Sequence, residues 1–141
     1  MNKIYIFYIH SICSTMPVFK EAYLSIRNQL QQQGVTLVAV SKTKSIEEIR
    51  VLYDMGQRDF GENYVQELLT KQVALPEDIR WHFIGHLQSN KVKYIVPFVH
   101  LIQAVDSEKL LIEMNKQAVK NNRIIQCLLQ VHIAKIGRAH V

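Results

Sequence analysis

The most informative run of this sequence is Val35-Thr36-Leu37-Val38-Ala39-Val40, which leads directly into Ser41 and Lys42. Six apolar or β-branched residues in succession are typical of a strand that is buried on both faces, because a strand with one face in water alternates apolar and polar residues. Such strands occur in parallel sheets, where a crossover connection, usually a helix, joins each strand to the next. The run therefore predicts an α/β fold in which Ser41 and Lys42 lie at the carboxyl end of a central strand.

Helical and extended patterns alternate along the rest of the chain. A helical pattern from Pro17 ends at Gly34, and the helix after the run opens with the capping box of Ser45 and Glu48 and stops at Gly56. The later elements that we expect are strand 59–63, helix 65–73, strand 81–85, helix 89–96, strand 99–105, helix 107–118 and strand 124–131. This makes five strands joined by four helical crossovers, which demands parallel strands with right-handed connections.

Two architectures fit this alternation, a doubly wound open sheet and a section of an eight-stranded barrel. The glycine-rich phosphate turn of dinucleotide-binding domains is missing after the first strand, so a domain of that class loses support. Polar residues or glycines lie where the strands end and the next helices begin, at 41–42, 61–63, 85–86 and 106. Both architectures bind their ligands at the carboxyl ends of the strands, so we expect one cluster of ligand-binding side chains on that rim.

Lys42 is the most unusual residue on this rim, since it follows an apolar strand rather than lying on a solvated helix face. Partial burial disfavours the charged form of an amine, and a neutral amine is what a Schiff base with an aldehyde requires. The alternative is that the side chain merely extends to solvent from the strand end. Lys44, across a turn, is the natural competitor. Asn63 can donate to and accept from a ring substituent, or it can cap the following helix.

We expect neither a metal site nor a disulfide. Cys13 and Cys127 lie far apart in the sequence and form no Cys-x-x-Cys pair. Four residues of extended strand separate His82 from His86 by about 13 Å, which is too far for both to bind one ion. His82 lies between two aromatic residues, a position more typical of a hydrogen-bonded core histidine than of a catalyst.

The composition is that of an ordinary globular protein. With 141 residues, of which 48% are hydrophobic, the chain can bury one sizeable core. The net charge of +5 is spread along the chain rather than gathered into a basic run, so we expect no nucleic-acid partner. The apolar run 4–9 is too short to span a membrane, and no small-residue cleavage site follows it. We therefore expect no membrane partner and a cytoplasmic location.

Three motifs resemble those of a known family. They read VAVSKTK at 38–44, GQRDFGENYVQE at 56–67 and WHFIGHLQSNK at 81–91. In this order they closely resemble the pyridoxal phosphate homeostasis proteins, and the resemblance extends over residues 23–135. It implies a partial TIM (β/α)8 barrel of the alanine racemase N-terminal-domain type, with about five strands present.

The resemblance also implies a ligand and its residues. Pyridoxal 5′-phosphate (PLP) would be held through a Schiff base to Lys42, with Asn63 lining the pocket and Lys44 taking part in cofactor exchange. His86 departs from the small residues common at its position, so no role is carried over to it. The family's proteins resemble monomeric or weakly dimeric cytosolic carriers that buffer the reactive aldehyde, without established catalysis.

Two other functions stay open. One is a PLP enzyme that acts on amino acids in the way of alanine racemase, which needs a second acid or base, usually a tyrosine from a separate C-terminal domain. The other is a plain interaction module without a cofactor. The colour of the purified protein distinguishes the interaction module from the two PLP-binding functions, since a protein that holds PLP is yellow.

The ends of the chain are expected to lie outside the barrel. The family's phosphate-holding segments belong to the last barrel strands and have no counterpart here, and a complete barrel needs about 250 residues. We therefore expect 16–135 to be the N-terminal part of a PLP-binding barrel, truncated after its fifth strand. Residues 136–141 correspond to a translated sequencing-library adapter and are expected to be an artefactual tail. Residues 1–15 are expected to be a non-native or disordered extension, with Met16 as the alternative start.

Overall fold

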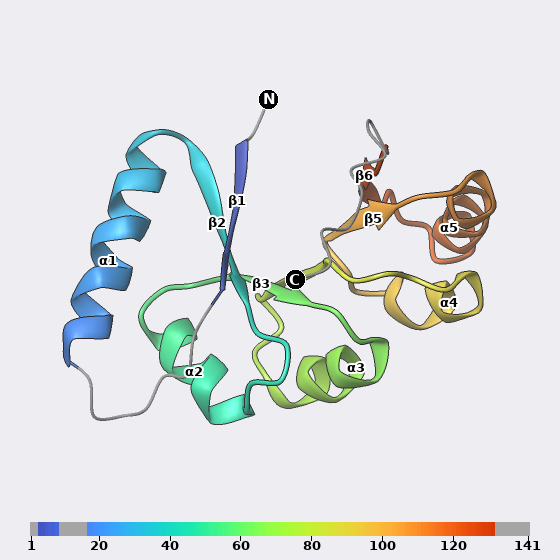
Figure 1. Cartoon of the computed structure of the whole chain (residues 1–141). Helices are drawn as coiled ribbons and strands as arrows, with labels where there is room; N and C mark the ends of the chain where they lie inside the picture. The colour runs from blue at the N-terminus through green and yellow to red at the C-terminus, as the bar shows by residue number, and fades with distance from the viewer. Residues whose placement is uncertain (1–2, 9–16, 132–141) are drawn as a thin grey trace, which may run out of the picture.

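The computed structural model describes residues 3–8 and 17–131, in which strands and helices alternate (Figure 1). The strands are β1 (Lys3–Tyr8), β2 (Val35–Val40), β3 (Asp59–Glu62), β4 (Arg80–Phe83), β5 (Leu101–Val105) and β6 (Gln126–Leu129). The helices are α1 (Pro17–Gln32), α2 (Ile46–Asp54), α3 (Val65–Ala74), α4 (Val92–Ile95), which follows a short 3₁₀ turn at Ser89–Lys91, and α5 (Glu108–Lys120). None of these helices is long and apolar enough to cross a membrane.

The strand order distinguishes between the two predicted architectures. All the strands pair in parallel, and each lies beside its neighbours in the sequence, in the order β1-β2-β3-β4-β5-β6. A doubly wound sheet would instead reverse its order at a switch point. The sheet is curled, and the helices lie along its outer side (Figure 1). The structure is therefore part of a (β/α)8 barrel, and the predicted fold class is confirmed.

The strand β1 differs from the prediction. We counted five strands from the sequence, whereas the described residues contain six, because Lys3–Tyr8 pairs with β2 along its whole length. The segment is rich in isoleucine and aromatic residues, which favour strands, and it satisfies backbone groups that an unpaired edge of β2 would expose. Residues 9–16 and 132–141, with Cys13 and Met16, lie outside the described residues. The predicted boundaries 1–15, 16–135 and 136–141 therefore stay predictions.

The predicted helix ends are confirmed. The Ser45 Oγ accepts a hydrogen bond from the Glu48 N–H at 3.2 Å, and a Glu48 carboxylate oxygen accepts from the Ser45 N–H at 2.9 Å, which completes the capping box. Gly34 and Gly56 follow α1 and α2 with φ angles of 66° and 92°, a left-handed conformation that glycine adopts without strain.

The hydrophobic core lies between the sheet and the helices. Its strand residues include Leu37, Ala39, Phe60, Trp81, Phe83 and Ile102, and its helix residues include Ile49, Leu52, Leu68, Val92, Ile95 and Leu110. Strand residues at alternate positions face the opposite, concave side, where Val38 and Ile84 lie against Gly61. The core thus holds the strands in register and fixes the rim at their carboxyl ends.

Candidate functional site

The residues predicted at the strand ends lie on one rim of the sheet. Lys42 follows β2, Asn63 follows β3, His86 comes after β4 and Asp106 directly follows β5. Because these strands are parallel neighbours, their carboxyl ends meet at one edge, as the sequence predicted. On this rim the Nδ1 atom of His86 lies 3.2 Å from a carboxylate oxygen of Asp106, and the His86 side chain is exposed.

Lys42 and Asn63 occupy corresponding places on neighbouring strands. Val40 of β2 is paired with Gly61 of β3, and Lys42 and Asn63 each come two residues later. The Lys42 side chain is half-buried. The structure therefore brings the loops of the two principal candidates together.

The competing lysine is engaged elsewhere. The Nζ atom of Lys44 lies 3.5 Å from a carboxylate oxygen of Glu48, in the first turn of α2. This ion pair directs Lys44 towards the helix that follows. The roles of both lysines stay predictions.

Asn63 offers an unsatisfied acceptor. Its Oδ1 atom is buried and has no hydrogen-bond partner among the residues that the structure describes. The residue at the N-cap of α3 is Tyr64 and no side chain caps that helix, so the alternative in which Asn63 is a cap is wrong. Buried polar atoms are normally hydrogen-bonded, and an exception next to a lysine loop fits a site whose ligand supplies the missing donor.

Gly85 is a residue of the site whose role the sequence did not reveal. A Cβ atom at this position would lie 2.3 Å from the carbonyl oxygen of Asn63 and 2.8 Å from its Cα. Only glycine therefore lets the end of β4 approach Asn63 so closely. The available signal was its place on the predicted rim, which did not indicate this contact.

A second polar group lies on the concave face, nearer the amino ends of the strands. His82 is buried, as predicted for a core histidine; its Nε2 lies 3.0 Å from an oxygen of Asp59 and its Nδ1 3.1 Å from Gln103 Nε2. Arg80 donates to both oxygens of Asp59, at 2.8 and 2.5 Å. Burial raises the pKa of Asp59, but the hydrogen bonds from His82 and Arg80 outweigh burial and hold that pKa below its usual value.

The same residues resemble a metal-binding set. Asp59, His82 and His100 each offer a ligand atom, and these atoms lie within 4.8 Å of one another. The sequence did not reveal this grouping, because the three residues are far apart in the sequence and meet only in the folded chain. Asp59 already accepts hydrogen bonds from Arg80 on both oxygens, so the group forms a satisfied hydrogen-bonded array. The expectation of no metal site stays a prediction.

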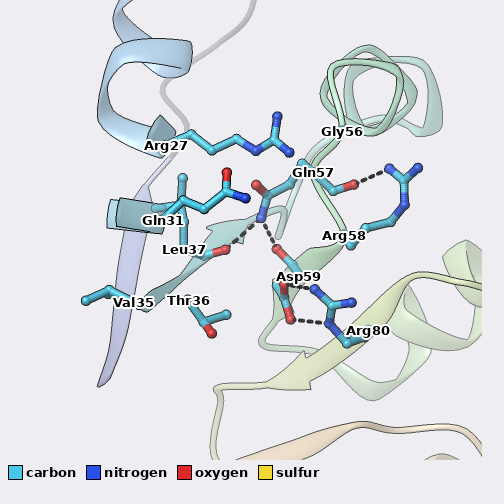
Figure 2. A pocket seen from close by; sticks show the side chains of 10 residues that line it. All are labelled: Arg27, Gln31, Val35, Thr36, Leu37, Gly56, Gln57, Arg58, Asp59 and Arg80. Atoms are coloured by element: carbon cyan, nitrogen blue, oxygen red, sulfur yellow. Dashed lines mark hydrogen bonds and ion pairs between the residues drawn. The ribbon is translucent and has the colours of Figure 1, made fainter. Parts of the chain in front are cut away.

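A cavity of about 220 Å³ lies at the other end of the strands (Figure 2). Arg27 of α1 and Arg80 at the start of β4 contribute to its walls. Gln57 donates through Nε2 to the carbonyl oxygens of Leu37 and Asp59, at 2.7 and 2.6 Å. These bonds tie the amino ends of β2 and β3 together, at the end of the barrel where polar residues serve stability rather than ligand binding.

Comparison with known proteins identifies relatives. The model of the family "Alanine racemase, N-terminal domain" matches residues 18–139. The pyridoxal phosphate homeostasis protein of Aquifex aeolicus is 46% identical over 98 residues, covering 69% of this chain and 43% of the relative. That of Schizosaccharomyces pombe is 49% identical over 90 residues, covering 60% and 38%. The chain thus spans about half the length of the curated relatives it matches, and the resemblance drawn from the motifs is confirmed.

A solved structure is also similar. PipY of Synechococcus elongatus, solved with PLP bound, superposes with a TM-score of 0.75 at 40% sequence identity, over 82% of this chain and 55% of that protein. The structure of PipY without PLP gives the same TM-score and identity.

Proposed function

Because this chain belongs to the alanine racemase N-terminal domain family, we propose that it binds PLP on the rim formed by Lys42 and Asn63 and that the complete protein is a PLP carrier. The observation that carries the proposal is the buried, unsatisfied Oδ1 of Asn63 beside the loop of a half-buried lysine. The PLP-bound structure of PipY supports it, since that protein is 40% identical to this chain. The relatives are named for homeostasis rather than for a reaction, which supports a carrier over a catalyst.

The residues present suit PLP. When bound, PLP supplies an aldehyde that condenses with a primary amine and releases water. Lys42 is the proposed amine, because the register of β2 and β3 places its loop beside that of Asn63. Asn63 is proposed to lie beside the pyridine ring, where its Oδ1 accepts a hydrogen bond from a ring substituent. Lys44, two residues beyond the attachment point, is proposed to assist exchange of the cofactor.

Chemical trapping tests the attachment point. The chain is incubated with PLP at low protein concentration, reduced with cyanoborohydride, digested and mapped by mass spectrometry. We expect the label on Lys42, well above its level on Lys116, whose side chain is 74% exposed and reports the background reactivity of a surface lysine. Lys42→Arg keeps the positive charge but should lose the label without changing that of Lys116. Label on Lys44 alone, or on no lysine, would contradict the proposal.

A further inference from the structure

A buried group of charges lies beneath the loop that carries Lys42. The ammonium group of Lys71, on α3, lies 2.8 Å from a carboxylate oxygen of Glu62 and 2.6 Å from one of Glu67. The side chains of Lys71 and Glu62 are only 5% and 0% exposed. No part of the proposed PLP site uses these three residues directly.

This group holds the main chain on both sides of Lys42. Lys71 Nζ donates to the carbonyl oxygen of Ser41 at 2.7 Å. The Thr43 N–H donates to Glu67 at 2.6 Å, on the same oxygen that Lys71 contacts. The Ser41 hydroxyl donates to Glu62 at 2.6 Å. The residue before Lys42 and the residue after it are therefore both fixed from α3 and the end of β3.

The loop needs such support because its backbone is strained. Thr43 has a φ angle of 61°, in the left-handed region that a β-branched residue rarely adopts. A residue persists in such a conformation only where its surroundings impose it. The bond between the Thr43 N–H and Glu67 acts directly on the strained residue.

Stability alone is a weak explanation for the buried charges. The free energy lost by removing ions from water can exceed the gain from pairing them, and apolar side chains of similar size often stabilise the same space equally well. The second oxygen of Glu62 is buried and has no hydrogen-bond partner among the described residues, which adds to this cost. Apolar replacements could not, however, hold the Ser41 carbonyl and the Thr43 N–H.

We infer that Lys71 is a positioning residue, which acts with Glu62 and Glu67 to hold the loop 41–44 so that Lys42 rather than Lys44 meets the ligand. This inference rests on the proposed function, because it concerns which lysine reacts with PLP. It assigns to Lys71 no contact with the ligand itself.

The test compares labelling of the two lysines. In the unsubstituted chain, trapping with PLP and cyanoborohydride should label Lys42 in preference to Lys44. Lys71→Met removes a charge-assisted hydrogen bond to the loop, so the ratio of Lys42 label to Lys44 label should fall about tenfold. Glu67→Ala should lower the ratio by a smaller factor, since the pair of Lys71 and Glu62 remains. Lys116→Met, which removes an exposed lysine of α5, is the matched control and should leave the ratio unchanged.

Hydrogen exchange gives a readout that does not depend on PLP. Both Lys71→Met and Glu67→Ala should speed exchange of the Thr43 amide about tenfold, whereas Lys116→Met should not. If Lys71→Met does not fold, Glu67→Ala decides, because the Glu67 side chain is 24% exposed and its loss leaves the buried pair intact. Unchanged label ratios and unchanged Thr43 exchange in a folded variant would overturn the inference. Faster Thr43 exchange in a chain that takes no label on Lys42 would overturn the proposed function but leave the support of the loop standing.

Discussion

At the scale of single residues, Gly85 sets how closely β4 approaches Asn63. A Cβ atom at Gly85 would meet backbone atoms of Asn63 at 2.3 to 2.9 Å, and backbone cannot move aside as a flexible side chain can. We expect Gly85→Ala to destabilise the fold by roughly 1–3 kcal/mol, the usual cost of overpacking. Thermal unfolding followed by circular dichroism measures this. Gly34→Ala is the control, because its Cβ would meet nothing within 4 Å and only its φ of 66° opposes the change. A loss no larger than that of Gly34→Ala would contradict the prediction.

Single residues also differ in how clearly the sequence indicates that they belong to the candidate site. The places of Lys42 and Asn63 at the strand ends could be predicted, because a polar residue close after a strand is visible in one dimension. Lys71 could not, since a lysine within an amphipathic helix normally lies in solvent. Its partners are separated from it by 4 to 30 positions and meet it only in the folded chain.

At the scale of elements, the polar array on the concave face makes stability depend on pH. Partial desolvation and the nearby His82 lower the pKa of the exposed His100 below its usual 6.5, although Asp59 opposes them. The unfolded chain therefore takes up a proton at His100 first, and stability falls as the pH drops below 6.5. We expect the drop from pH 7.5 to pH 5.5 to lower the urea midpoint of the unsubstituted chain relative to that of His100→Gln.

Glu62 changes the stability with the opposite sign. The test is therefore the difference in pH dependence between the unsubstituted chain and His100→Gln, rather than the pH dependence of either chain alone. Burial raises the pKa of Glu62 above 4.5, although Lys71 and Ser41 lower it, and stability therefore falls as the pH rises from 4.5 through the raised value. This contribution is common to both chains and cancels in their difference. Equal pH dependence of the two chains would contradict the role given to His100.

Elements differ in how well their patterns predict them. The strand 35–40 was predicted with the bounds that the structure has, because six apolar or β-branched residues in a row leave few alternatives. The strand β1 was not counted, although its composition favours a strand. Its role depends on pairing with the edge of β2, a contact that no local pattern contains.

At the scale of the whole molecule, the choice between a barrel section and an open sheet could not be made from the alternation of helices and strands. Both architectures use the same helical crossovers, and only the pairing order of the strands separates them. The resemblance to a known family supplied that choice. The chain spans about half the length of the curated relatives it matches, so the resemblance covers only that part of their length.

The incomplete barrel carries an apolar edge. Leu129 and Val131 are 65% and 73% exposed, and within residues 3–8 and 17–131 the strand β6 pairs only with β5. An edge with unpaired backbone groups and apolar side chains favours pairing with another chain. We therefore expect the 141-residue polypeptide to be poorly soluble and to self-associate as its concentration rises. Because the phosphate-holding segments of the resembled family have no counterpart in this sequence, we also expect PLP to bind at Lys42 too weakly to be retained through a desalting column.

Sedimentation velocity over a range of concentrations measures this association. Leu129→Lys and Val131→Lys place charges on the edge, and they should shift the distribution towards monomer because a buried, unpaired ammonium is costly. Val73→Lys is the matched control, since Val73 is 82% exposed but lies on α3, away from β6. It should change the net charge equally without reducing association. A soluble monomer that retains PLP through the column would contradict both expectations and show that the β6 edge is satisfied within one chain.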